Sequence, residues 1–260
     1  MILVTGGAGF IGSAVARRLT ELGHPVRVVD DLSKGQPGSV PPDCEVIRGD
    51  ITDSDVCSRA FRDVDTCFHL AAKIGGIGYF HKYPADILDD NNLMLSQVFR
   101  HATAADAKVV YVSSSMVFER TGEWPTPESA LDRFPPPFSA YGFSKLIGEW
   151  YCRAFHAQFG MRFAIARPFN AYGPGEFPED EPGLAHVVPD LIKKILEGGR
   201  PIELLGDGTQ TRSFTFVEDV ADAIVTIGLH PDGEGDDFQH RYGHGDFRLG
   251  AVALSVAGVR

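Results

Sequence analysis

Two side chains, Tyr141 and Lys145, have the types and the spacing that proton transfer requires. Residues four apart lie on one face of a helix, so the lysine ammonium would stand beside the phenol. A tyrosine near its ordinary pKa of about 10 is a poor base at neutral pH, but a nearby positive charge stabilises its phenolate. Tyr141 could then accept the proton of a substrate hydroxyl while a hydride leaves the same carbon. In isolation, the same pair also fits an ordinary amphipathic helix.

A run of three serines, Ser113-Ser114-Ser115, closes the predicted strand Val109–Ser113 and continues past it. Ligands of parallel sheets bind beyond the carboxyl ends of the strands, so a hydroxyl here could orient a substrate alcohol or carbonyl. Three serines in a plain turn are the alternative. Only the combination with Tyr141 and Lys145 favours a catalytic role.

Gly6, Gly9 and Gly12 form a glycine turn between an apolar run at residues 2–5 and a helical pattern at residues 13–22. The first glycine permits a tight turn, the second lets the backbone approach a pyrophosphate, and the third allows close packing of helix on strand. The helix N-terminus then offers free N–H groups and a partial positive charge to phosphate. We therefore predict a nicotinamide dinucleotide site at this turn.

Residues at the ends of the following strands refine this prediction. Asp30 can accept hydrogen bonds from both ribose hydroxyls and would repel a 2′-phosphate, so NAD is expected rather than NADP, although Lys34 nearby weakens the argument. Asp50 could pair with the adenine amino group while Ile51 covers the ring, or Asp50 could simply cap a helix. The small residues in Leu70-Ala71-Ala72 suit the close approach of a cofactor.

Strand and helix patterns alternate along the chain, which implies a doubly wound α/β fold of the Rossmann type, with a parallel sheet and right-handed crossovers. β-branched runs predict the strands and apolar spacings of three and four predict the helices. We expect a Rossmann domain over residues 1–168 and a small, truncated substrate-binding part over residues 169–260. The predicted strands are Ile2–Thr5, Val26–Val29, Glu45–Arg48, Thr66–Leu70, Val109–Ser113 and Arg162–Ala166, and the predicted helices are Ser13–Leu22, Ser54–Arg62, Ile87–Ala105, Ala140–Gln158, Val187–Leu196 and Val217–Ile227.

Composition excludes several partners. The net charge of −11 argues against nonspecific binding to nucleic acid or to anionic membranes. The sequence has no apolar stretch of about 18 residues that could span a membrane. The four cysteines are scattered without a Cys-x-x-Cys pair, so we expect free thiols in a reducing cytoplasm and neither a disulfide nor a metal site.

At this point the chain resembles the extended short-chain dehydrogenase/reductases that act on nucleotide sugars. The matching segments follow the family order over about the first 228 residues, and they read TGGAGFIGS, VVDDLSKG, GDITD, HLAA, PADILDDNN, YVSSSMVF, YGFSK, RPFNAYGPG and GDGTQTRSFTFVEDVADA. The resemblance implies that Ser114, four residues before Phe118, is the catalytic hydroxyl beside Tyr141 and Lys145. It also implies a homodimer through the helices Ile87–Ala105 and Ala140–Gln158.

The resemblance implies further contacts. Asn91 would lie near the cofactor, Asn170 would contact the phosphates of the sugar nucleotide, and Arg212 would pair with the diphosphate, which suits guanidinium geometry. Taken alone, Arg212 would be interpreted as a surface charge. The predicted cofactor-binding residues are Gly6, Gly9, Phe10, Ile11, Gly12, Asp30, Asp31, Asp50, Ile51, Leu70, Ala71, Ala72, Asn91, Tyr141, Lys145 and Pro168, and the predicted substrate-binding residues are Ser114, Asn170, His186 and Arg212.

The positions after Ser114 distinguish the chemistries within this family. Dehydratases carry Asp-Glu there and related decarboxylases keep the Glu, whereas this chain has Ser115 and Met116. GDP-fucose synthases and GDP-mannose 3,5-epimerases have a cysteine where Met116 stands, and a thioether cannot move protons as that thiol does. Yet AAKIGGIGYFHKYPADI and Leu184–Lys194 resemble the GDP-fucose synthases. His186 falls where that group has an acid/base histidine, or it could bond the nucleotide or cap a helix.

The chemistry that remains needs only the three predicted catalytic residues and NAD. It consists of oxidation at C4 of the sugar, rotation of the 4-keto sugar, and return of the hydride to the other face. We therefore expect a nucleotide-sugar 4-epimerase, with a nucleotide-sugar 4-keto reductase as the alternative enzyme.

The resemblance ends near His230, and residues 237–260 carry no family pattern. A one-base shift over residues 239–251 can be read as a segment that looks like the family's next one, so a frameshift is one hypothesis for this atypical tail over residues 231–260. A second class of hypothesis follows, in which the chain is an NAD-binding protein without turnover. Such a protein would bind NAD tightly but would bind no nucleotide sugar.

Overall fold

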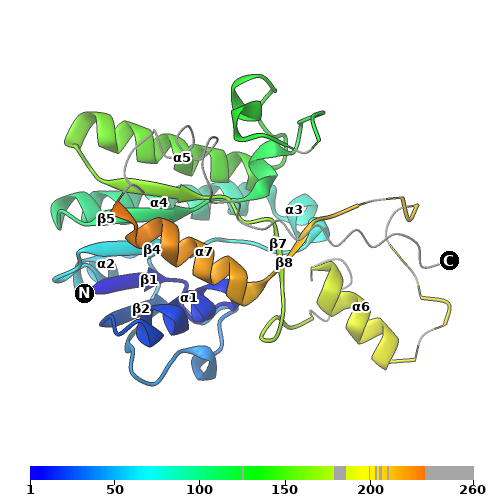
Figure 1. Cartoon of the computed structure of the whole chain (residues 1–260), viewed down its shortest axis with the longest axis horizontal. Helices are drawn as coiled ribbons and strands as arrows, with labels where there is room; N and C mark the ends of the chain where they lie inside the picture. The colour runs from blue at the N-terminus through cyan, green and yellow to red at the C-terminus, as the bar shows by residue number, and fades with distance from the viewer. Residues whose placement is uncertain are drawn as a thin grey trace.

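The computed structural model describes residues 1–124, 126–178, 186–198, 200–202, 204, 207–209 and 211–231. Its centre is a six-stranded sheet of parallel strands in the order β3-β2-β1-β4-β5-β6 (Figure 1). The predicted doubly wound α/β fold is therefore confirmed. The strands are β1 (Ile2–Thr5), β2 (Val26–Asp30), β3 (Glu45–Arg48), β4 (Thr66–His69), β5 (Lys108–Val112) and β6 (Phe163–Ala166).

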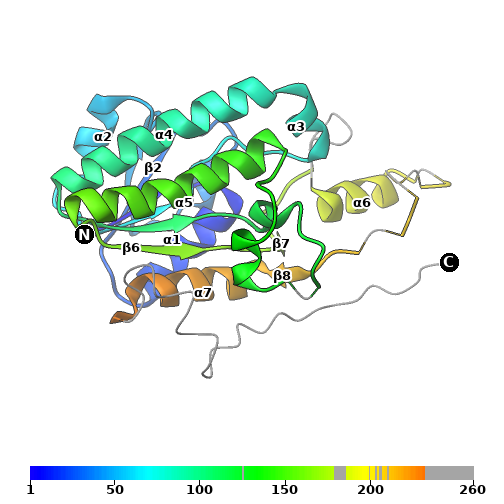
Figure 2. The ribbon, with the colours of Figure 1, turned by 90° about the horizontal axis from the view of Figure 1, so that it is seen from above.

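Helices cover both faces of this sheet (Figures 1 and 2). One face carries α2 (Ser54–Ala60), α4 (Pro84–Ala104) and α5 (Ala140–Phe159), and the other carries α1 (Phe10–Glu21) and α7 (Val217–Leu229). Arg18 on α1 donates a hydrogen bond from Nε to Asp222 Oδ1 of α7 at 2.5 Å. The segment with α7 thus returns to the sheet, although the predicted division at residue 168 assigned it to the second part of the chain.

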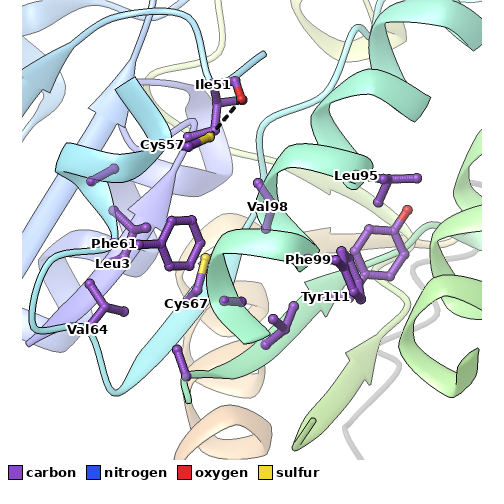
Figure 3. Packing of buried hydrophobic residues seen from close by; sticks show 14 of the residues in the cluster. Leu3, Ile51, Cys57, Phe61, Val64, Cys67, Leu95, Val98, Phe99 and Tyr111 are labelled. Atoms are coloured by element: carbon purple, nitrogen blue, oxygen red, sulfur yellow. Dashed lines mark hydrogen bonds between the residues drawn. The ribbon is translucent and has the colours of Figure 1, made fainter. Parts of the chain in front are cut away.

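Alternate side chains of each strand fill two separate cores. On β1, Val4 packs towards α1 and α7, whereas Leu3 packs towards α2 and α4. Figure 3 shows the core between the sheet and the helices α2 and α4. There Leu3 packs with Phe61, Cys67 and Phe99, and each of these side chains is at most 4% exposed. Burying each such side chain stabilises the fold by about 1.5–3 kcal/mol, so these contacts fix the sheet on which the site is built.

Several short elements at the carboxyl edge of the sheet were not predicted. They include α3 (Ile77–Lys82) and a small parallel pair, β7 (Asn170–Tyr172) and β8 (Phe214–Phe216). The predicted helix α6 (Val187–Leu196) is confirmed and stands beyond this edge in both views (Figures 1 and 2). The 3-10 turns are η1 (Pro37–Ser39), η2 (Ser115–Phe118) and η3 (Glu128–Asp132).

Within the described part of the chain, none of the helices has the length and apolarity needed to cross a membrane. Nearly all of the atypical tail, including the segment of the frameshift hypothesis, lies outside the described residues.

Candidate active site

The structure brings Ser114, Tyr141 and Lys145 together beyond the carboxyl end of β5. Ser139 caps the N-terminus of α5 by accepting a hydrogen bond from the Gly142 amide at 3.1 Å, which places Tyr141 in the first turn. The Ser114 hydroxyl is hydrogen-bonded to the Tyr141 phenol, and Lys145 Nζ lies 5.8 Å from the centroid of the phenol ring. A hydroxyl, a phenol and an ammonium therefore converge as proton transfer requires.

Burial controls the protonation of this group. Burial raises the pKa of Tyr141 and the hydrogen bond to Ser114 lowers it only in part, so the expected depression of the Tyr141 pKa is not found in the chain by itself. Burial also lowers the pKa of Lys145 to about 8. Its ammonium donates to the Val112 carbonyl at 2.9 Å, which holds the charge close beneath the phenol.

An aromatic ring that was not predicted covers the phenol. Phe80 of α3 lies parallel to Tyr141, with 4.9 Å between ring centroids and 8° between planes. Tyr141 is only 5% exposed, and the Phe80 ring is one of the groups that cover it. The run of aromatic residues around Phe80 was a weak signal in the sequence, because α3 is too short to show a helical period.

The glycine turn fits a pyrophosphate because its backbone leaves no room for side chains. Gly6 has φ +69°, and a Cβ there would lie 2.8 Å from the Ala71 nitrogen, while a Cβ on Gly12 would lie 2.0 Å from the Gly6 carbonyl oxygen. No side chain caps α1 after Gly9, and the first turn of α1 has no acidic residue. Its N–H groups and its positive end are therefore available to an anion, which agrees with the predicted dinucleotide site.

Asp30 at the end of β2 braces this turn. Its Oδ2 accepts from the Ala8 amide at 2.9 Å and its Oδ1 accepts from the Leu32 amide at 2.8 Å. Each carboxylate oxygen keeps a further lone pair, so ribose hydroxyls could still be bound. The neighbouring Asp31 is exposed and accepts two hydrogen bonds from Ser33, one from its amide and one from its hydroxyl.

Asp50 and Ile51, the predicted adenine-binding pair, differ in their exposure to solvent. Asp50 accepts from the Thr52 amide at 2.8 Å, and the cap of α2 is Asp53, so the alternative that Asp50 caps this helix is wrong. The Asp50 carboxylate stays exposed at the sheet edge. Ile51 is 5% exposed and packs in the core, which leaves little of its side chain to cover an adenine ring.

Thr5 and His69 join β1 to β4 where the strand order reverses, the position at which doubly wound sheets bind ligands. Thr5 Oγ1 lies 2.7 Å from His69 Nδ1 and accepts from the amides of Leu70 and Ala71 at 3.2 and 3.1 Å. Because its lone pairs are used, the hydroxyl donates to Nδ1, which assigns the ring proton to Nε2. Burial lowers the pKa of His69 to about 3, so the ring is neutral.

Asn91 of α4 is buried, and both the oxygen and the nitrogen of its side-chain amide form hydrogen bonds within the protein. Its Oδ1 accepts from the Lys73 amide at 2.6 Å, and its Nδ2 donates to Ser144 Oγ at 3.0 Å. Asn91 therefore connects the loop after β4 to α5 at Ser144, the residue that precedes Lys145.

The predicted substrate contacts lie at the small β7–β8 sheet and at α6. Asn170 donates to the Ser213 carbonyl at 2.9 Å, and Arg212 donates to the Thr211 carbonyl at 2.8 Å, so the two predicted residues share one end of this sheet. His186 occupies the N-cap position of α6 without a side-chain cap, and its ring bonds Glu176 instead. Among the described residues, no group of three or more His, Cys, Asp and Glu side chains could hold a metal ion.

Comparison with known proteins identifies the family of the chain. The sequence profile of the NAD dependent epimerase/dehydratase family matches residues 2–239. A UDP-glucose 4-epimerase from Mycolicibacterium smegmatis is 34% identical over 245 residues, covering 91% of this chain and 75% of the relative. The crystal structure of UDP-glucose 4-epimerase with UDP-glucose from Thermotoga maritima has a TM-score of 0.79 at 31% identity, covering 88% of this chain and 73% of that one.

A third similar protein is named as a dehydratase and not as an epimerase. The double mutant of a dTDP-glucose 4,6-dehydratase from Streptomyces venezuelae, solved with NAD and DAU bound, has a TM-score of 0.80 at 28% identity, covering 90% of this chain and 73% of that one. The fold is thus shared by proteins named as epimerases and as dehydratases. With its profile match, its glycine turn and its Tyr-x-x-x-Lys pair, the chain belongs to the NAD-dependent epimerase/dehydratase family of extended short-chain dehydrogenase/reductases.

Proposed function

We propose that this chain is an NAD-dependent nucleotide-sugar 4-epimerase. The observation that carries the proposal is the convergence of Ser114, Tyr141 and Lys145 at the same carboxyl edge of the sheet as the glycine turn. These groups can remove and return a hydroxyl proton. Together with a cofactor that accepts and returns a hydride, they need no other reactive side chain to invert a carbinol carbon.

Each of the three residues would have its own role in the reaction. Ser114 orients the C4 hydroxyl of the sugar, and Tyr141 accepts its proton as the carbon is oxidised. The Lys145 ammonium offsets the cost of a buried phenolate. When bound, NAD would supply the hydride acceptor and the positive charge of its nicotinamide ring. After rotation of the 4-keto sugar, Tyr141 returns the proton to the oxygen on the inverted carbon.

The residues after Ser114 favour this reaction over elimination. Met116 is partly exposed in η2, and its side chain is neither acidic nor a thiol. Loss of water from a sugar needs an acid and a base beyond the phenol, and 3,5-epimerisation needs a group that moves protons on carbon. Neither is provided at Ser115 and Met116, which supports the simpler C4 chemistry.

Asp30 supports NAD rather than NADP as the cofactor. Its carboxylate is fixed beside the glycine turn by the amides of Ala8 and Leu32. We expect the adenosine ribose to bind this carboxylate. A 2′-phosphate there would meet a fixed negative charge, which costs binding free energy.

A 4-keto reductase is the second candidate, because the segment from Ala71 to Ile87 resembles the GDP-fucose synthases. This segment contains α3, whose Phe80 stacks on Tyr141. A reductase would use the same three residues in one direction only and would consume a reduced cofactor.

The experiment is an incubation of the purified chain and NAD with UDP-glucose, UDP-glucuronate and GDP-sugars. An epimerase yields the C4 epimer with no net change in NADH absorbance. Consumption of NAD(P)H with a 4-keto sugar and no epimer would move the assignment to the reductase. Tight binding of NAD without binding of any nucleotide sugar would favour the protein without turnover.

A homodimer and a cytoplasmic location are part of the same proposal. The outer faces of α4 and α5 expose Leu93, Trp150 and Phe159, at 45, 64 and 54%. Exposed apolar side chains on two neighbouring helices suit an interface between two copies. Sedimentation at micromolar concentration tests this interface, and a monomer would contradict it.

A further inference from the structure

Glu149 lies on α5 about two helical turns after Tyr141 and one turn after Lys145. It is 0% exposed, although glutamate is seldom fully buried unless paired. Its Oε1 accepts from Ser113 Oγ and from Arg167 Nε, both at 2.7 Å, and its Oε2 accepts from Arg167 Nη2 at 2.7 Å. The carboxylate therefore holds one hydroxyl and one guanidinium fork at once.

Arg153 of the same helix also lies 3.9 Å from Glu149 Oε2. The two residues that hydrogen-bond Glu149, Ser113 and Arg167, belong to the loops that form the site. Ser113 precedes Ser114 at the end of β5, and Arg167 precedes Pro168 at the end of β6. The same loops are joined by the Ser115 amide, which donates to the Pro168 carbonyl at 3.0 Å. The Arg167 guanidinium also stands 5.5 Å from the Phe118 ring centroid, at the end of η2. Glu149 thus links the helix of Tyr141 to both neighbouring loops.

Stability alone does not account for a charged group in this position. Replacing a buried ion pair by apolar side chains of similar volume is often neutral or stabilising. The pair does provide fixed geometry, because a carboxylate that receives three charge-assisted or short hydrogen bonds, two of them from one guanidinium fork, is restricted in orientation. Ser114 is one peptide unit from this anchor, and its hydroxyl must meet the phenol of a residue on the anchored helix.

We propose that Glu149 is a positioning residue that holds the Ser114 hydroxyl against Tyr141 by anchoring Ser113 and Arg167 to α5. The kinetic part of this inference rests on the proposed 4-epimerase function, whereas its geometric part does not. Glu149 touches no substrate and takes no proton in the reaction.

The sharpest test is Ser113→Ala, which removes one hydroxyl and leaves the Glu149–Arg167 pair intact. We expect kcat to fall roughly tenfold, because a shift of about 1 Å in a reacting group costs up to a hundredfold. KM, the Kd for NAD and the midpoint of thermal unfolding should stay close to wild type. A wild-type kcat in Ser113→Ala would overturn the inference.

Glu149→Gln and a control at a half-exposed Arg–Glu pair give an independent test. Glu149→Gln should lower kcat more than Ser113→Ala does and should also lower the thermal midpoint, because Arg167 loses its charged partner. Glu45→Gln removes a carboxylate from another Arg–Glu pair, where Arg27 Nη2 lies 2.9 Å from Glu45 Oε2 at the far edge of the sheet. This control should keep wild-type kcat and KM. An equal loss of kcat in both variants would contradict a specific role for Glu149.

A crystal structure of Ser113→Ala separates this inference from the proposed function. We expect the Ser114 hydroxyl to leave the Tyr141 phenol in that variant, whether or not the wild-type chain turns over a nucleotide sugar. An unchanged hydrogen bond between Ser114 and Tyr141 would overturn the positioning role even if the chain is an epimerase.

Discussion

Phe80 and Tyr141 stack face to face, with 4.9 Å between their ring centroids. One ring comes from the short helix α3 and the other from the first turn of α5. This stack keeps water from one face of the phenol that we assign as the proton acceptor. The segment after β4 therefore helps to bury Tyr141, about 60 positions later in the chain, and burial raises the pKa of this phenol.

Replacing the covering ring should change the titration of Tyr141. Phe80→Ala admits water to the phenol, so the raised pKa of Tyr141 should fall towards its ordinary value. The measurement is the phenolate absorbance against pH, with Tyr141→Phe subtracted to isolate this residue. Phe138→Ala removes an aromatic side chain that is 75% exposed and should leave the titration unchanged. An unmoved Tyr141 titration in Phe80→Ala would show that the stack does not control this pKa.

Lys145 should make stability depend on pH in a defined window. Burial lowers its pKa from 10.5 to about 8 in the folded chain, so between these values the unfolded chain binds the extra proton. Stability of the wild type relative to Lys145→Met should therefore rise from pH 8 to pH 10, by about 2–3 kcal/mol.

Urea unfolding of both proteins at several pH values measures this difference. Lys194→Met alters a lysine of α6 that is 27% exposed, and it should follow the wild-type curve. A constant difference between wild type and Lys145→Met across this window would contradict the burial of the ammonium.

The close approach at Gly12 predicts a severe effect of one methyl group. In Gly12→Ala the new Cβ would lie 2.0 Å from the Gly6 carbonyl, so the glycine turn must shift. We expect NAD binding to weaken by roughly a hundredfold and the protein to lose about 1–3 kcal/mol of stability. Gly38→Ala meets nothing within 4 Å and serves as the control. Isothermal calorimetry with NAD measures the effect, and wild-type affinity in Gly12→Ala would refute this account of the turn.

Asp30 should determine the choice between the two nicotinamide cofactors. Asp30→Ala removes the carboxylate, so the Kd for NAD should rise by about 10-fold or more while discrimination against NADP falls. Both constants can be measured by calorimetry, with Asp43→Ala as a control at an exposed acid outside the site. Equal affinity of the wild-type protein for NAD and NADP would contradict the role given to Asp30.

Patterns local to the chain predicted most of the sheet and the cofactor turn. The β-branched runs correspond to strands because both faces of a parallel sheet are covered, as at Val26–Asp30. Helix starts were less accurate. Helix α1 begins at Phe10 rather than Ser13, because Gly9 and Gly12 resemble loop residues, and α4 begins at Pro84, which suits the first position of a helix.

Features that depend on distant contacts could not be predicted from such patterns. The strands β7 and β8 have three residues each, and they pair Asn170 with Phe214 across an intervening helix. Glu149, four residues after Lys145, looks like an ordinary surface acid on a helix. Only the folded sheet brings Ser113 and Arg167 to it, from the ends of two neighbouring strands.

Hydride transfer at C4 is the central claim, and isotopic labelling at that carbon tests it most directly. The purified chain with NAD would be given UDP-glucose, UDP-glucuronate and a GDP-sugar, each deuterated at C4, in ordinary water. We predict a C4 epimer that keeps its deuterium, without net formation of NADH, and loss of this product in Tyr141→Phe. A C4 epimer that carries a solvent proton at this carbon, or a Tyr141→Phe variant as active as wild type, would contradict the claim.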